Sequence, residues 1–95
     1  MDLKECFRKH AEEQGYFVLI ENPLHRRPDV CGFLYLDTLC CQSSRDMINH
    51  AEYGQIYLST DCRELAELAE EKDILYLVRC GISYDADKEC LTMFV

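Results

Sequence analysis

Cysteine is the residue type in this chain with the widest chemical scope, and two of the seven cysteines, Cys40 and Cys41, are neighbours. Such a pair could form a redox couple, bind a metal or pack as two small apolar side chains. A disulfide between adjacent residues requires a strained geometry, and structural zinc sites bring their ligands in pairs two to four residues apart. No C-x-x-C pair occurs. We therefore interpret Cys40 and Cys41 as thiols that face a core just before a helix beginning at Ser43.

Two other groups of residues approach the pattern of a metal site. Cys6 and His10 are four apart on one face of an expected helix, where core and boundary residues are the commoner interpretation. Asp85, Asp87 and Glu89 alternate as at the start of a calcium loop, but the glycine and glutamate needed at positions 6 and 12 of such a loop are missing. We expect a solvated turn there, and no metal or cofactor.

The chain shows no specific pattern for catalysis. A cysteine or serine nucleophile needs an imidazole base within reach, and seven cysteines with three histidines allow many pairs without favouring one. The four glycines are scattered and do not form a phosphate-binding loop. The sequence therefore predicts a protein that is not an enzyme. A small metal-binding or thiol-redox protein that uses its cysteines is the alternative.

The odd cysteine count and the charged opening MDLKECFRKH predict reduced thiols in a cytoplasmic protein. No stretch reaches the roughly 18 apolar residues of a membrane span. With 48% hydrophobic residues in 95, the chain can build one core, so we expect a single domain over residues 1–95.

Helix starts are indicated by capping patterns, in which an oxygen side chain is followed three residues later by a carboxylate. The pairs are Asp2 with Glu5, Ser43 with Asp46, and Asp61 with Glu64. They predict a helix over about 3–14, a short helix from Ser43 that ends at Gly54, and a strong helix over about 61–73. The inward residues expected on the last two are Met47, Ile48 and Ala51, and then Cys62, Leu65, Leu68 and Ala69.

Apolar runs between these helices predict the remaining elements. Residues 16–20 and 55–59 read as strands, 21–30 as a loop, and 30–41 as a buried element of undetermined type. Residues 74–80 fit either a strand or a helix, and Asp73 as N-cap with Gly81 as the stop favours a helix. Residues 82–95 predict a hairpin that turns at DADK. The fold class is α+β: a short antiparallel sheet with a C-terminal hairpin, covered by three or four helices.

Charge is the most informative property for function. The net charge is −8, which disfavours direct binding to nucleic acid or to an anionic membrane. Residues 1–47 hold 6 basic and 8 acidic side chains, whereas residues 48–95 hold 4 and 10. We expect an acidic partner-binding surface in the C-terminal half, formed by Glu64, Glu67, Glu70, Glu71, Asp73, Asp85, Asp87 and Glu89.

This pattern predicts an acidic interaction domain that docks on a basic partner, itself a nucleic-acid-handling protein or complex, and inhibits or modulates it. In size, acidity and lack of catalytic motifs the chain resembles the small inhibitors of phages and mobile elements, of which anti-CRISPR proteins are the best-known kind. A homo-oligomer is a further possibility, because aromatic side chains favour interfaces. The tyrosines expected to be exposed are Tyr35, Tyr53, Tyr57, Tyr76 and Tyr84.

Overall fold

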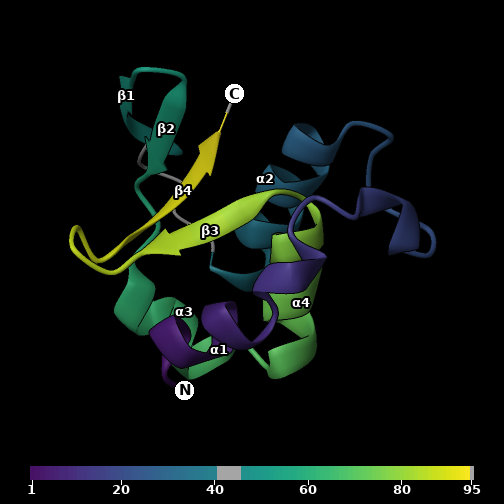
Figure 1. Cartoon of the computed structure of the whole chain (residues 1–95), viewed down its shortest axis with the longest axis horizontal. Coiled ribbons are helices and arrows are strands. Elements are labelled where there is room, and N and C mark those ends of the chain that lie inside the picture. The colour runs from purple at the N-terminus through teal and green to yellow at the C-terminus, as the bar shows by residue number, and fades with distance from the viewer. Residues whose placement is uncertain (41–45, 95) are drawn as a thin grey trace.

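The computed structural model describes residues 1–40 and 46–94. Within these ranges the chain forms one four-stranded antiparallel sheet and several helices (Figure 1). The strand order is β1-β2-β4-β3, so that two hairpins meet through β2 and β4. The strands are β1 (Ile48–Glu52), β2 (Gln55–Leu58), β3 (Ile82–Asp85) and β4 (Cys90–Phe94). The predictions of β2 and of the C-terminal β3–β4 hairpin are confirmed.

Helices lie below the β3–β4 hairpin and to the right of the sheet in Figure 1, and the β1–β2 hairpin extends at the top left. They are α1 (Leu3–Lys9), α2 (Pro28–Leu39), α3 (Cys62–Leu68) and α4 (Glu71–Arg79), with single 3-10 turns η1 (Ala11–Glu13) and η2 (Phe17–Leu19). The predicted α+β class is therefore confirmed. Within the described ranges, no helix has the length and apolar character to cross a membrane.

Helix α4 lies at the centre of the core. Its residues Ile74, Leu77 and Val78 are almost completely buried, and it contacts α1, α2 and β3. Helix α2 comes particularly close at Gly32, where an added Cβ would lie 3.1 Å from the Cβ of Cys80 and 3.0 Å from Cδ1 of Ile82. The residue just after α4 therefore packs directly against a helix about fifty residues earlier in the chain.

The N-terminal helix is shorter than predicted. Asp2 caps α1 as expected by accepting the Glu5 backbone N–H at 3.3 Å, but the helix ends at Lys9. Residues 10–15 instead form tight turns, because Gly15 donates its N–H to the Val78 carbonyl at 3.0 Å and Glu13 approaches Arg79 at 3.4 Å. Contacts with the end of α4 thus replace the last turn of the expected helix.

The strand predicted over residues 16–20 is wrong. Phe17–Leu19 forms a 3-10 turn, in which Leu19 and Ile20 donate to the carbonyls three residues earlier. The run is not buried either: Val18 is 89% exposed. Apolar composition suggested a strand here, but the sheet offers this segment no partner strand, so its backbone bonds locally.

The undetermined element at 30–41 is the helix α2, which begins at Pro28 and so includes the last residues of the predicted loop 21–30. Pro28 occupies its first turn, where a missing N–H has no cost. Cys31, Leu36 and Cys40 are buried, as expected for Cys40. Cys41 and the predicted capping residue Ser43 lie outside the described residues.

The helix predicted to end at Gly54 is wrong over its described part, because Ile48–Glu52 forms β1. Tyr53 and Gly54 have φ angles of 48° and 75°, and two successive positive φ values are the mark of the tight type I′ hairpin turn. Glu52 consequently pairs with Gln55, and β1 folds back on β2. The turn, and not the apolar periodicity of the segment, decides its structure.

The long helix predicted over 61–73 is divided in two. Asp61 caps α3 as expected, but Ala69 is extended, with φ −82° and ψ 146°, and α4 restarts at Glu71. Leu65 and Ala69 face the core, whereas Leu68, predicted inward, is 53% exposed.

Asp73 is not the N-cap of α4. Glu70 takes that place, and Asp73 completes a capping box by accepting the Glu70 backbone N–H at 2.8 Å. Its other carboxylate oxygen accepts the Tyr35 hydroxyl of α2 at 2.5 Å. The side chain is only 6% exposed, so Asp73 joins α2 to the start of α4 inside the protein.

Replacing Asp73 by alanine should lower the free energy of unfolding by about 2–4 kcal/mol, because one helix cap and one charge-assisted hydrogen bond are lost and the Tyr35 hydroxyl has no partner left. Urea denaturation followed by circular dichroism measures this change. Asp87→Ala, in an exposed turn, is the matched control and should change stability by less than about 0.5 kcal/mol. Equal effects of the two substitutions would contradict the role given to Asp73.

Candidate functional site

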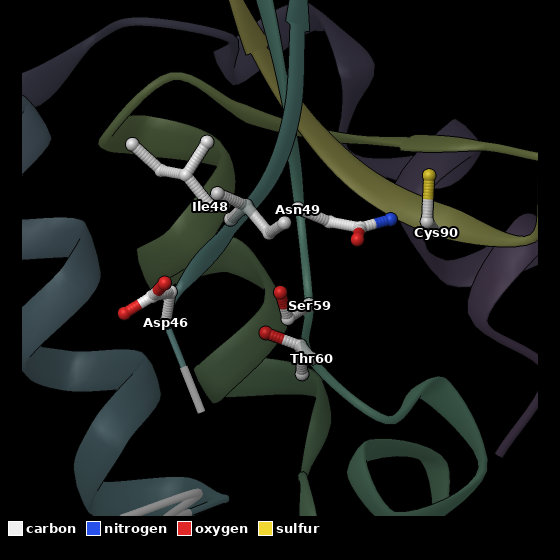
Figure 2. A pocket seen from close by; sticks show the side chains of 7 residues that line it. Asp46, Ile48, Asn49, Ser59, Thr60 and Cys90 are labelled. Atoms are coloured by element: carbon white, nitrogen blue, oxygen red, sulfur yellow. The ribbon is translucent and has the colours of Figure 1, made fainter. Parts of the chain in front are cut away.

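A hollow of about 560 Å³ lies at the base of the β1–β2 hairpin. Figure 2 shows the Asn49 amide directed toward Cys90, with the Ser59 and Thr60 side chains between them and Asp46. Leu58 and Ile48 complete the described lining. The hollow therefore combines a carboxylate, an amide, hydroxyls and one thiol.

The thiol of Cys90 is not an activated nucleophile. Burial raises its pKa, and the nearby Asp85 carboxylate raises it further, against the opposing effect of Lys88. No imidazole is present among the described residues of the lining. A thiol that keeps its proton, without a base to remove it, does not attack a substrate readily.

The other thiols with a shifted pKa have the same character. Burial is the first cause that raises the pKa of Cys6, Cys62 and Cys80, and for Cys62 the value reaches about 11. Across residues 1–40 and 46–94, no cysteine pair lies at disulfide distance and no three metal-ligating side chains converge. His10, the candidate partner of Cys6, instead contacts the Glu71 carboxylate at 3.0 Å.

The eight acidic residues predicted to bind a partner divide into two groups, of which the first maintains the fold. Asp73 is buried in the capping box described above. Glu71 binds Lys9 of α1 at 2.6 Å as well as His10, and these contacts lower the pKa of its carboxyl group. Asp85 accepts the backbone N–H groups of Asp87 and Lys88, which fixes the β3–β4 turn. These contacts already occupy the three carboxylates.

The second group is exposed. Glu64 and Glu67 lie on α3, Asp87 and Glu89 lie in the β3–β4 turn, and none of the four forms an ion pair within the described part of the chain. Glu70 is also exposed but approaches Lys72 at 3.4 Å. We refer to Glu64, Glu67, Asp87 and Glu89 as the unpaired acids.

The unpaired acids come from two elements that adjoin. Helix α3 and the β3–β4 turn line one hollow of about 630 Å³ through Arg63 and Glu89, together with Lys4 of α1 and Tyr84 of β3. Lys88, the cation inside the turn, forms no ion pair with Asp87 or Glu89 within the described residues, and its Nζ lies 4.0 Å from the centre of the Tyr57 ring. The unpaired acids therefore lie on neighbouring elements, with Arg63 and Lys4 in the hollow that these elements line.

The prediction that five tyrosines are exposed is correct only for Tyr53, which is 97% exposed. Tyr57 is buried beneath Lys88, and Tyr35 and Tyr76 stack with ring centres 3.7 Å apart. Phe94, which the sequence did not single out, is 70% exposed and pairs with Gln55 beside the Tyr53 turn. Successive residues of a strand face opposite sides of the sheet, so an inward Met93 predicts an outward Phe94. This alternation could have identified Phe94 as an exposed aromatic residue.

Comparisons of the chain with protein-family models, with curated protein sequences and with solved structures found no match. Function is therefore inferred from the fold and from the chemistry of its surface.

Alkylation of Cys62 by iodoacetamide at pH 8 should be at least about tenfold slower in the folded protein than in urea, because a pKa of about 11 leaves far less thiolate than the ordinary value of 9.0. The folded-state rate should continue to rise toward pH 11, whereas the unfolded-state rate levels off above pH 9. Peptide mass spectrometry resolves the rate at each cysteine. Equal rates in the two states would contradict the raised pKa.

The same shift has a consequence for stability. The unfolded chain loses the Cys62 proton first as the pH rises, so this residue's contribution to stability is complete below pH 9 and decreases between pH 9 and about 11.

Proposed function

We propose that this chain is a non-enzymatic protein-interaction domain that docks on a basic, nucleic-acid-handling protein and inhibits or modulates it. The observation that carries the proposal is the set of unpaired acids on α3 and the β3–β4 turn. Lys and Arg side chains that normally contact phosphates are complementary to such a surface. By occupying those cations, the domain would compete with nucleic acid for the same partner surface.

The division of the acidic residues supports this assignment. Glu71 and Asp85 each have partners that account for their position in the fold, whereas Glu64, Glu67, Asp87 and Glu89 have no ion-pair partner among the described residues. Like charges on neighbouring elements repel and slightly oppose folding. A basic partner removes this repulsion when it binds, so the relief of repulsion favours association.

Charge reversal tests the proposal directly. The full chain is immobilised in three forms, wild type, Glu64→Lys/Glu67→Lys and Asp87→Lys/Glu89→Lys, and exposed to a nuclease-treated lysate of the source organism at low salt. The wild type should retain a basic nucleic-acid-binding protein. With that protein purified, each reversal should slow association by about tenfold, and added salt should slow wild-type association in the same way.

A matched control is available on the opposite half of the sequence. Glu12→Lys/Glu21→Lys changes the net charge by the same amount at two exposed acids, and should leave association nearly unchanged. If the control slows association as much as the other reversals, total charge and not this surface is responsible. Retention that does not depend on salt, or on any of the four unpaired acids, would overturn the proposal.

A further inference from the structure

Beyond the proposed function, we propose that β1 is a dimerisation edge: two copies of the chain pair their β1 strands antiparallel about a two-fold axis at Ala51, forming one continuous eight-stranded sheet. The occupant of the edge is a second copy of this chain. The proposal rests on the open edge of β1 and on the order of its side chains, and does not depend on the acidic residues of α3 and the β3–β4 turn.

The two edge strands of the sheet, β1 and β3, differ in how far neighbouring side chains contact them. At β3, the Ser83 hydroxyl donates to the Gln14 side chain at 3.0 Å, and Phe7 of α1 stacks on Tyr84 with ring centres 6.1 Å apart. At β1, all five residues are exposed, and pairing within the described chain is to β2 alone. One covered edge and one open edge favour a closed dimer, since a filament would need both edges to be free.

The backbone N–H and C=O groups at the centre of β1 are oriented to bond with a second copy. The tight turn closes on the Glu52–Gln55 pair, and Ser59 donates its N–H to the Met47 carbonyl at 2.8 Å, so alternate residues of β2 bond toward β1. By the alternation of an antiparallel ladder, the N–H and C=O of Ala51 point away from β2. A two-fold axis at Ala51 lets each copy donate to and accept from the other at this residue.

The side chains of β1 are self-complementary in that register. The axis places His50 of each copy opposite Glu52 of the other, in the closely spaced type of pair where side chains interact most strongly. Within one chain these side chains already contact at 3.2 Å on the same face of the strand. Charged residues usually discourage pairing at an edge. Here, however, an antiparallel second copy places an imidazole opposite a carboxylate at both positions.

The same register covers exposed apolar surface. The regular register of β1 runs from His50 to Glu52 and shifts between Ile48 and His50, so the pairing is confined to the end of the strand next to the Tyr53 turn. Tyr53 is otherwise almost fully exposed at a positive φ of 48°, a conformation that tyrosine seldom adopts, and Ile48 is about half exposed. Partial cover of Tyr53 by the second copy adds hydrophobic stabilisation to the backbone bonds.

Light scattering after size exclusion, over a range of protein concentrations, tests the proposal. The wild type should approach about twice the monomer mass of 11.1 kDa as concentration rises. Ala51→Pro removes the outward N–H without a bond to β2 to break, and should raise the dissociation constant by about tenfold or more. Ala51→Thr, which keeps the N–H, is its matched control and should still dimerise.

Charge exchange tests the register separately. His50→Glu should weaken the dimer, because it places two carboxylates opposite each other, and the double variant His50→Glu/Glu52→Lys should restore it. Circular dichroism establishes that each variant is folded. A wild type that stays monomeric at every concentration, a dimer that tolerates Ala51→Pro, or a double variant that does not recover would overturn the proposal. Because none of these measurements involves a partner protein, failure here leaves the proposed function to its own test.

Discussion

The buried carboxylate of Asp73 is the contact on which the arrangement of the helices depends. It closes the capping box that starts α4 and accepts the Tyr35 hydroxyl of α2, whose ring stacks on Tyr76 one turn further along α4. The Tyr76 hydroxyl in turn accepts the backbone N–H of Leu24 at 3.2 Å. One acidic side chain thereby links α2, α4 and the segment between η2 and α2. Since α4 carries much of the core, its position sets that of α1 and β3 as well.

Acidity serves two purposes in this molecule. Asp73, Glu71 and Asp85 form contacts inside the fold, and the strong acidity of the C-terminal half is therefore partly a structural property. The unpaired acids on α3 and the β3–β4 turn are left for the partner that we propose, and they are fewer than net charge alone suggests. Every thiol with a shifted pKa has it raised, chiefly by burial, and a thiol that keeps its proton reacts slowly.

The acidic surface and the β1 edge lie on different elements but close to each other. The acids lie on α3 and the β3–β4 turn, and Lys88 of that turn lies over the Tyr57 ring, on which His50 of β1 stacks. A dimer through β1 would carry two copies of the acidic surface. Two linked sites bind a partner with repeated basic surfaces more tightly than one site alone.

Local signals in the sequence were sufficient where a few neighbouring residues determine the structure. Asp2 and Asp61 cap α1 and α3 as predicted, and the alternation and turn chemistry around Asp85 identify the C-terminal hairpin. The α+β class, β2 and the burial of Cys40 also follow from the sequence. In each case a short-range pattern of hydrogen bonding or polarity agrees with the final fold.

Only the tertiary structure decided the remaining elements. Phe17–Leu19 is apolar like a strand but has no strand to pair with, and Ile48–Glu52 has helical spacing but is folded back by a turn at Tyr53. The break at Ala69 redirects α4 into the core, and this redirection buries Asp73, which the charge pattern had assigned to the surface. Backbone pairing and burial depend on residues far apart in the chain, so the sequence alone determined how much acidic charge is present, and the fold decided which of it is exposed.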